Sequence, residues 1–296
     1  MAVLADMYAG LSGLTARWTV RYGEQLRLAG SDLPTPDSLR VPTRHGRVRV
    51  DLYRPPAVDR PPVHVHLHGG AFIMRFPQMD DFFCRFVVAE AQVAVVNVDY
   101  LAAPRVRYPV AQEQAHDVLA WLTTHAGEWG LDPDRISIGG FSGGGNLAAS
   151  ACLQARDHHT ATPRLQLLAV PSLDVSGDVR GKPSTTANPM IGPPLLRLVR
   201  ATYFKDSSRR AEPYASPLLA VAVDGLPPAL VITAEYDSLR TEGDAFAARL
   251  MAAAVSVEHH VVPRRDHYFL DGSDHTQARH WMSLMADRIQ VALAGE

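Results

Sequence analysis

Residues 140–144 read Gly-Phe-Ser-Gly-Gly, and this stretch decides the fold of the 296-residue chain. It follows a short apolar run at 135–139 and opens a stretch of helical pattern at 146–154. A serine between glycines at a strand-to-helix turn is typical of a nucleophile elbow. Such a turn strains the backbone at Ser142, and glycines on both sides avoid clashes with the adjoining strand and helix. The pentapeptide also occurs by chance, so it needs supporting context.

A second glycine-rich turn supplies part of that context. Residues 68–72 read His-Gly-Gly-Ala-Phe and close the apolar run 62–67. Glycines let backbone N–H groups point at one spot, which is how an oxyanion hole is built. We predict an oxyanion hole in which three N–H groups donate and a further glycine makes the turn: Gly70, Ala71 and Gly143 as donors, and Gly69 at the turn.

Two later predicted strands, the buried run 229–234 and the stretch 255–262, are each followed by titratable side chains. Asp237 follows the first and His267 follows the second. The order serine, acid, histidine, each just past a strand, is that of α/β-hydrolases and not that of chymotrypsin or subtilisin. We therefore expect Ser142 to be the nucleophile, His267 its base and Asp237 the carboxylate that orients the imidazole.

Other acids and histidines fit these roles less well. Glu235 lies closer to its strand, and Asp266 adjoins His267, where it is expected to cap the loop. His259 and His260 fall within a strand, one expected to face the core and one the solvent. His275 and His280 fall in the final helical stretch. Only His267 lies in a loop just past a strand.

The composition limits the class of protein. The chain is 47% hydrophobic and 20% charged, with a formal net charge of −2. This suits one large α/β domain and argues against nucleic acid or an anionic membrane as the main partner. No signal peptide and no membrane-spanning run is evident. Cys84 and Cys152 are isolated, which suits a reducing cytoplasm and suggests neither a disulfide framework nor a zinc site.

Short apolar runs alternate with amphipathic stretches from about residue 46 onward. This alternation predicts an α/β fold with a mainly parallel sheet covered by helices on both faces. The expected strands are 47–53, 63–67, 93–98, 135–139, 165–170, 229–234 and 257–262. The expected helices are 79–91, 110–126, 144–157, 241–254 and 275–293.

Two regions depart from this rhythm. Residues 1–40 have a helical pattern at first and become loop-like around Pro34 and Pro36. Residues 175–215 are rich in Gly, Pro, Ser and Thr, and one helix is expected near 194–204. Such departures often form a lid over the strand ends where ligands bind. We expect a single domain, 1–296, with a small helical cap formed by about 1–40 and 175–215.

The chain resembles the hormone-sensitive-lipase-like branch of the α/β-hydrolase esterases between about residues 45 and 275. The matching segments lie at 68–72, 98–100, 103–104, 108–109, 140–146, 216–218, 226–228, 234–239 and 242–243. The resemblance implies an α/β-hydrolase fold, an N-terminal helical cap, and hydrolysis of short to medium acyl esters without a cofactor. It also makes a homodimer formed by edge-strand pairing plausible, although no residue in the sequence supports one.

Several positions depart from that branch. Ala71 replaces a glycine of the oxyanion loop but keeps its N–H, and Phe141 and Gly143 flank the serine where the branch has other residues. An acidic residue of the segment after Tyr100 is replaced by Arg105, and Arg75 with Phe76 replaces a small residue. These changes leave the chemistry intact and bear on the shape of the substrate.

Some further side chains have two interpretations each. His64, His66 and His68 share one face of a strand, but such side chains point in parallel some 7 Å apart, so packing is favoured over a metal site. We expect His68 to bond to the backbone of the oxyanion loop. Core packing and pocket lining are both open for a set of aromatic side chains: Phe72, Phe76, Phe141, Tyr203, Phe204 and Tyr268. For Arg75, a solvated loop position is favoured over a place beside the pocket.

The sequence thus predicts a cytoplasmic serine carboxylic-ester hydrolase with a small-molecule ester substrate and no metal or organic cofactor. His267 takes the proton of Ser142 during attack, and an acyl-serine forms that water then hydrolyses. Because the imidazole must be neutral to act, the rate should fall in acid. An amidase or N-deacetylase with the same triad stays open. A non-catalytic small-molecule receptor is disfavoured because all three triad residues are present.

Overall fold

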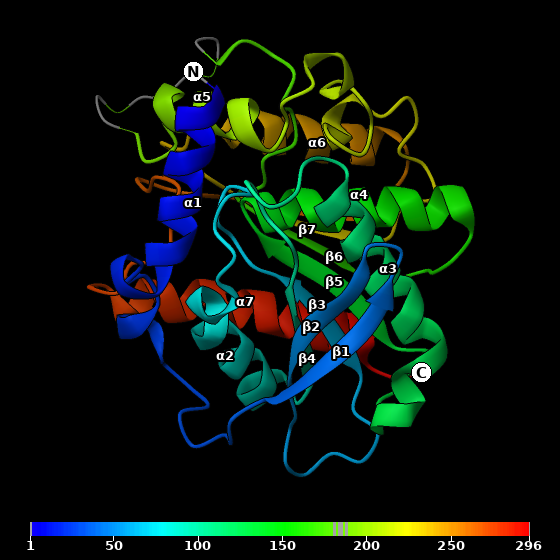
Figure 1. Ribbon diagram of the computed structural model, residues 1–296. Coiled ribbons are helices and arrows are strands. Elements are labelled where there is room, and N and C mark those ends of the chain that lie inside the picture. The colour runs from blue at the N-terminus through cyan, green and yellow to red at the C-terminus, as the bar shows by residue number, and fades with distance from the viewer. Residues whose placement is uncertain (1, 180–181, 183–185, 187–188, 296) are drawn as a thin grey trace.

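Eight strands form one sheet in the computed structural model, which describes residues 2–179, 182, 186 and 189–295. The strand order is β1-β2-β4-β3-β5-β6-β7-β8. The first two pairs in that order are antiparallel and the other five are parallel (Figure 1). The strands are β1 (Asp37–Thr43), β2 (Gly46–Tyr53), β3 (Val63–Leu67), β4 (Ala94–Asp99), β5 (Ile136–Phe141), β6 (Gln166–Ala169), β7 (Ala229–Ala234) and β8 (Val257–Val262).

Helices cover both faces of this sheet. The α-helices are α1 (Ala2–Thr19), α2 (Asp81–Ala91), α3 (Val110–His125), α4 (Gly143–His158), α5 (Pro193–Thr202), α6 (Arg240–Ala252) and α7 (His275–Leu293). Short 3-10 turns are η1 (Glu24–Leu26), η2 (Pro77–Asp80), η3 (Ala126–Trp129), η5 (Ser207–Arg209) and η6 (Pro217–Leu219). Buried residues of α3, α4 and α6 share one core with the sheet, and those of α2 and α7 share the other. The predicted α/β-hydrolase architecture is confirmed.

The parallel strands lie close to where the sequence placed them. β3, β7 and β8 have the predicted bounds, and β4, β5 and β6 differ by one or two residues at an end. The carboxyl ends of these strands meet at one edge of the sheet, as parallel strands require. The loops that follow β3, β5, β7 and β8 therefore come together there.

The first strand is not among the expected strands, which begin at residue 47. β1 begins at Asp37, so residues 37–40 belong to the sheet and not to the predicted cap. β1 is an edge strand that contains Pro42, and only Val41 in it is fully buried. An edge strand with one buried side chain and a proline has little apolar periodicity. The sequence pattern therefore did not predict this strand.

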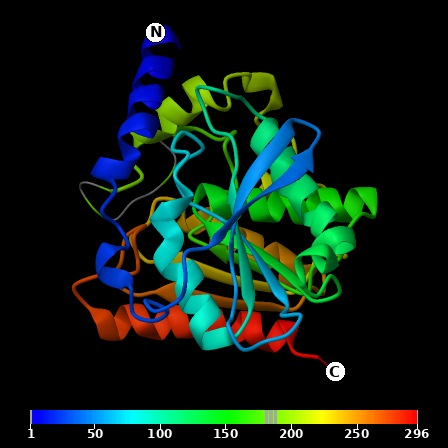
Figure 2. The same cartoon turned by 60° about the horizontal axis from the view of Figure 1, so that its bottom comes forward.

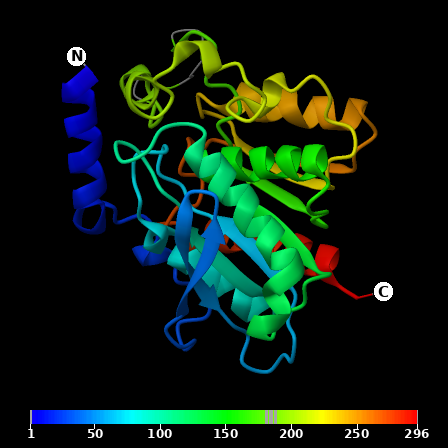
Figure 3. The ribbon, with the colours of Figure 1, turned by 45° about the vertical axis from the view of Figure 1, so that its right-hand side comes forward.

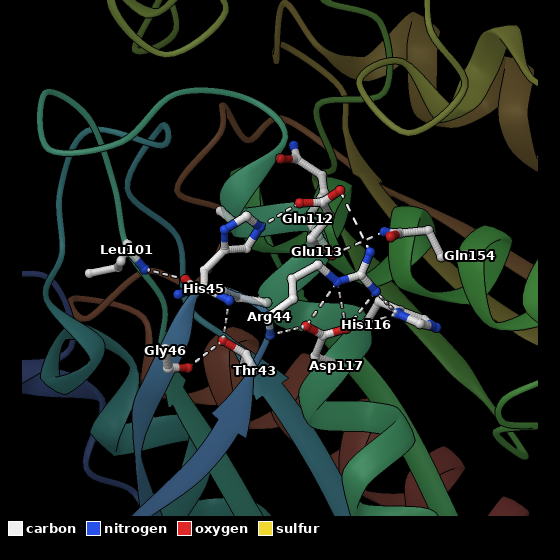
Figure 4. Close-up of polar contacts among 12 residues, drawn as sticks. Thr43, Arg44, His45, Gly46, Leu101, Gln112, Glu113, His116, Asp117 and Gln154 are labelled. Atoms are coloured by element: carbon white, nitrogen blue, oxygen red, sulfur yellow. Dashed lines mark hydrogen bonds and ion pairs between the residues drawn. The ribbon is translucent and has the colours of Figure 1, made fainter.

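The hairpin turn between β1 and β2 is fixed to α3 by polar contacts (Figure 4). The backbone N–H of Arg44 donates to Asp117 Oδ2 at 2.8 Å, and its guanidinium lies 2.6 Å from Asp117 Oδ1. His45 contacts Glu113 one turn earlier on the same helix. These contacts attach the outer hairpin to the body of the fold.

Two segments lie over the carboxyl edge of the sheet. α1 and α5 pack side by side there, far apart in sequence (Figure 1). α5 lies close to the helix predicted near 194–204. Within the expected cap segment 175–215, residues 180–181, 183–185 and 187–188 lie outside the described residues.

Within the described part of the chain, no helix combines the length and the apolar character needed to cross a lipid bilayer.

Candidate active site

Ser142 lies at the turn between β5 and α4. Its backbone has φ 55° and ψ −116°, a left-handed conformation that side chains other than glycine rarely adopt. A Cβ atom on Gly140 or Gly144 would clash with the carbonyl oxygen of Leu67 at the end of β3. The two glycines therefore let the elbow approach β3 closely, and Ser142 lies at the position just before the first residue of α4.

His267 and Asp237 are joined directly. Nδ1 of His267 lies 2.8 Å from Oδ2 of Asp237, and both residues are 3% exposed. The other carboxylate oxygen, Oδ1, accepts the N–H of Leu239 at 3.0 Å. With Nδ1 donating to the acid, Nε2 is the ring atom left to accept a proton.

Ser142 and His267 line the same pocket. No hydrogen bond joins their side chains within the described residues. Catalytic hydrogen bonds are often long in a free enzyme and tighten only when substrate is bound. The three predicted triad positions thus meet at the carboxyl edge of the sheet.

A buried carboxylate stabilises the glycine-rich turn after β3 through a hydrogen bond to its backbone. Asp80 is 1% exposed, and its Oδ2 accepts the N–H of Gly69 at 3.2 Å and faces Nε2 of His66 at 3.0 Å. The N–H of Gly69 is therefore engaged within the protein. By contrast, the N–H groups of Gly70 and Ala71 donate to no acceptor among the described residues.

The same holds for the first N–H of α4, that of Gly143, because the opening N–H groups of a helix have no partner within it. Ala71 has φ 52° and Gly70 has φ 123°, so the loop turns sharply at these two residues. Gly70, Ala71 and Ser142 line the first pocket, and Gly143 lines a second pocket beside Ser142.

His68 supports the turn as expected. Its Nδ1 lies 2.5 Å from the carbonyl oxygen of Gly69, and its ring stacks on Tyr100 with centroids 4.3 Å apart. The Tyr100 hydroxyl donates to the carbonyl oxygen of His68 at 2.8 Å. Complete burial lowers the pKa of His68 to about 4, so the ring is neutral near pH 7.

The other two histidines of this strand have separate partners. His64 Nδ1 lies 2.9 Å from Ser137 Oγ, and His66 faces Asp80. Burial, with a smaller effect from His66, lowers the pKa of His64 well below its usual range. Across the described residues, no group of three or more histidine, cysteine, aspartate or glutamate side chains is arranged to hold a metal ion.

Two pockets meet at Ser142. Ala71, Ile191 and Leu195 line both. The first has a volume of about 120 Å³ and is also lined by His267, Met190 and Tyr268. The second has a volume of about 30 Å³ and is also lined by Gly143, Leu196 and Val199. Both walls are mainly apolar, as expected for a site that binds a small organic molecule.

The aromatic side chains with two open interpretations divide between pocket lining and packing, and Phe76 lines neither pocket. Phe141 and Tyr268 line the first pocket and Phe72 lines the second. Tyr203 and Phe204 pack against Phe72, with centroids 5.2 Å and 5.0 Å away, and lie behind the wall.

Arg75 is absent from the lining of both pockets. Its Nε lies 2.7 Å from Asp99 Oδ1, and Arg49 approaches the same carboxylate at 3.1 Å. The partner lies 24 positions away at the end of β4, which local sequence could not reveal. Arg75 is thus an exposed loop residue, as the sequence favoured, and it is ion-paired with Asp99.

His259 and His260 both lie half-buried on β8 instead of dividing between core and solvent. His259 Nε2 lies 3.1 Å from Asp244 of α6, and His260 packs against Trp281 of α7. α6 and α7 cover the two faces of this edge strand, so neither side chain reaches the elbow.

Three polar residues at the site were not predicted in these roles. Asp80 precedes a helix and reads as an ordinary cap. Asp266 caps its loop as expected, since Oδ1 accepts the N–H of His267 at 2.7 Å, but Oδ2 also accepts the N–H of Met190 at 2.9 Å. Ser238, next to Asp237, donates to the carbonyl oxygen of Ile191 at 2.6 Å. For two of these contacts the sequence signal is a polar residue beside a candidate triad position: Asp266 precedes His267 and Ser238 follows Asp237.

Comparison with known proteins identifies the class of this fold and site. A family model described as alpha/beta hydrolase fold matches residues 64–271. A carboxylic ester hydrolase, LipN, of Mycobacterium tuberculosis is 32% identical over 92% of this chain and 72% of its own length. An ethyl acetate hydrolase of Pseudomonas putida is 31% identical over 92% of this chain and 89% of its own length.

Solved structures agree. A hyperthermophilic esterase from the archaeon Pyrobaculum calidifontis superposes with a TM-score of 0.85 at 30% identity, covering 99% of this chain and 95% of that one. The chain belongs to the α/β-hydrolase family, within its hormone-sensitive-lipase-like esterase branch. It is a carboxylesterase-type hydrolase, as the sequence predicted.

Proposed function

We propose that Ser142, His267 and Asp237 form the catalytic triad of this carboxylesterase. The observation that carries the proposal is the 2.8 Å contact between His267 Nδ1 and Asp237 Oδ2, with Ser142 on the same pocket wall. Asp237 fixes the tautomer in which Nε2 is free to accept a proton. Nε2 takes the proton of the Ser142 hydroxyl as Oγ attacks the ester carbonyl carbon.

The tetrahedral oxyanion that results is stabilised by the free N–H groups of Gly70, Ala71 and Gly143. Backbone donors fixed in place need no reorganisation when charge develops, and one such donor is worth roughly 3–4 kcal/mol of transition-state stabilisation. Gly69 shapes the turn and gives its own N–H to Asp80. The proposed oxyanion hole therefore uses three donors, with Gly69 as its structural support.

The two pockets take the two halves of the ester. The departing alcohol must receive its proton from His267. His267 lines the first pocket and not the second, so the alcohol occupies the first. The acyl group then occupies the second pocket, which is the smaller of the two and therefore favours short acyl chains. The name of the Pseudomonas putida relative, an ethyl acetate hydrolase, is in keeping with this preference.

Water then enters the first pocket in place of the alcohol. His267 removes its proton, hydroxide adds to the acyl carbon, and collapse of the second tetrahedral intermediate returns the proton to Ser142 Oγ and releases the acid. The acyl bond to serine is broken as the carboxylic acid forms, so the enzyme is regenerated without any cofactor.

The rest of the predicted organisation stays a proposal as well. The chain is a single hydrolase domain whose cap consists of residues 2–36 and the described part of 175–215, where α5 lines both pockets. Cys84 and Cys152 are free and buried, which fits a reducing cytoplasm. We also propose that the protein is a homodimer.

Hydrolysis of p-nitrophenyl esters from acetate to laurate, with the Ser142→Ala variant alongside, tests this function. Turnover by the wild type that is greatest for short chains and absent in the variant is expected. Matched anilides of the same acids separate an esterase from an amidase, because the amide leaving group is poorer. Equal or faster cleavage of the anilides, or activity that survives in the variant, would overturn the proposal.

A further inference from the structure

The helix α1 packs against the body of the protein with its small residues. Ala9 and Ala16 are buried, at 0% and 1% exposure. A Cβ atom on Gly10 would lie 3.5 Å from Pro104, and one on Gly13 would lie 3.1 Å from the carbonyl oxygen of Ile73. The helix therefore lies close to the chain beneath it, with little room for larger side chains on its inner face.

Its large apolar residues point outward. Figures 2 and 3 show α1 at the margin of the molecule, with no other element across its outer side. Seven large side chains lie on that side and are between 57% and 73% exposed: Val3, Leu4, Met7, Tyr8, Leu11, Leu14 and Trp18. We call these seven residues the outer face of α1.

The spacing of the outer face is that of a helix-pairing seam. Leu4, Met7, Leu11, Leu14 and Trp18 follow one another at intervals of three, four, three and four residues. This is the a and d pattern of a coiled coil, in which apolar residues repeat every 3.5 positions on average. A pattern of this kind is typical of a helix that packs against another helix along its length.

The size of the outer face points the same way. An aromatic side chain carries roughly 150–250 Å² of surface and a large aliphatic one lies near or below the low end of that range, so seven at these exposures present on the order of 800 Å². The largest apolar patch on a soluble monomer is usually about 300–600 Å². A standard protein interface buries about 800 Å² from each partner. The outer face alone matches one side of such an interface.

We propose that the outer face of α1 binds the same face of a second copy of this chain. A two-fold axis places one such surface on its equal, so a single contact covers both exposed faces. The proposal concerns assembly and does not depend on the assigned triad. It places the homodimer contact on α1 and not on the edge of the sheet.

The charges of α1 disfavour a lipid surface as the occupant. Helices that lie on membranes carry lysines and arginines on the face opposite their apolar one. In α1 that opposite face packs on the protein, and the helix has one basic residue, Arg17, whose guanidinium lies 3.8 Å from the ring of Trp18. Its one acidic residue, Asp6, pairs with Arg107 at 2.7 Å. No cluster of positive charge is present on α1 to attract anionic lipid.

Pairing at α1 would also bear on the pockets. α1 packs against α5, whose Leu195 lines both pockets. Tyr22, three residues past the end of α1, stacks on Tyr268 with centroids 4.3 Å apart, and both line the first pocket. A partner helix on the outer face would hold these cap elements in place over the site.

Light scattering during size-exclusion chromatography of the full chain tests the proposal. The wild type should have twice the mass of one chain, and the double variant Leu11→Glu, Leu14→Glu should have the mass of one chain. Both side chains are exposed, so the substitutions leave the core intact. Val291→Glu, on the exposed side of α7 at 66% exposure, is the matched control and should stay dimeric.

Disulfide cross-linking through a cysteine at the centre of the seam is a second measurement. It detects the intact dimer and does not rely on a variant that dissociates. Leu11 is the middle one of the five seam residues, so Leu11→Cys should form an intermolecular disulfide when an oxidant such as copper phenanthroline is added. The native cysteines, Cys84 and Cys152, are buried and do not compete.

A monomeric wild type, or a double variant that stays dimeric, would overturn the proposal. A monomer that floats with phosphatidylcholine vesicles through α1 would also overturn it, in favour of a lipid surface.

Discussion

Asp266, the neighbour of the proposed base His267, accepts the backbone N–H of Met190 at 2.9 Å and so ties the pocket wall to the loop that carries His267. Ser238, the neighbour of Asp237, does the same through the carbonyl oxygen of Ile191 at 2.6 Å. Met190 lines the first pocket and Ile191 lines both. The pocket wall is thus hydrogen-bonded to the two loops that carry the proposed acid and the proposed base.

Loss of one of these ties should weaken substrate binding more than chemistry. Ser238→Ala removes one hydrogen bond, worth about 1 kcal/mol, so KM should rise about fivefold while kcat changes little. Steady-state kinetics on a short p-nitrophenyl ester measures both values. Ser273→Ala is the control, because its hydroxyl bonds to Asp271 away from the pockets. A KM equal to that of the wild type would refute a role for the tie.

The elbow glycines should respond in opposite ways to an added methyl group. A Cβ on Gly144 would clash with carbonyl oxygens of Leu67 and His68, so Gly144→Ala should abolish activity or folding. A Cβ on Gly143 would meet Phe72 at 3.5 Å, an ordinary contact, and alanine keeps the proposed donor N–H. Gly143→Ala should keep acetate-ester activity within a few-fold of wild type. Loss of activity in both variants would show that the close contact with β3 does not explain the glycines.

Acyl-chain preference should depend on the second pocket alone. Leu196 lines that pocket and not the first, so Leu196→Ala should move the preferred p-nitrophenyl ester toward longer chains. Met190 lines only the first pocket, and Met190→Ala should alter the preference for the alcohol instead. Rates on matched acyl and alcohol series measure the two effects. If the acyl preference moved in the Met190 variant and not in the Leu196 variant, the assignment of the pockets would be reversed.

Stability should fall in acid because buried histidines stay neutral in the folded chain. Burial lowers the pKa of His64 well below its usual range and that of His68 to about 4, against 6.5 for a free histidine. Each of these rings therefore binds a proton on unfolding once the pH is below about 6.5. For each ring, stability falls by about 1.4 kcal/mol per pH unit as the pH drops, until the folded pKa is reached.

Thermal melts at neutral pH and at pH ~5 check this expectation. His64→Gln removes one of the two titrating rings, so the loss of Tm in acid should be smaller than in the wild type. His280→Gln, at an exposed position on α7, should leave the loss unchanged. An unchanged loss in the His64 variant would mean that this ring does not contribute.

The inner strands and the candidate triad could be predicted because each depends on local patterns. β7 is an almost continuous apolar run, β3 alternates apolar residues with histidine, and Ser142, Asp237 and His267 each follow the end of a predicted strand. β1 lacked that pattern, since its exposed edge position needs few apolar residues. The edge strand β8 was predicted from its sequence. The partners of its two histidines, His259 and His260, were not predicted.

Contacts between distant parts of the chain could not be predicted in the same way. Asp80 reaches Gly69, Arg75 reaches Asp99 and Asp266 reaches Met190 only after the loops fold over the sheet. A single sequence shows an acid beside a helix or a loop arginine, and such residues have many potential partners. The outward side of α1 also needed the structure, because its inner face packs through alanine and glycine and not through its larger residues.

The assignment of Ser142 as nucleophile is tested most directly by covalent labelling. Diethyl p-nitrophenyl phosphate transfers its diethylphosphoryl group to an activated serine and releases p-nitrophenol, so intact-protein mass spectrometry counts the labelled sites. We expect one adduct per chain, located by peptide mapping on residue 142, and none in Ser142→Ala. An adduct on another residue, or labelling that persists in the variant, would contradict the proposed triad.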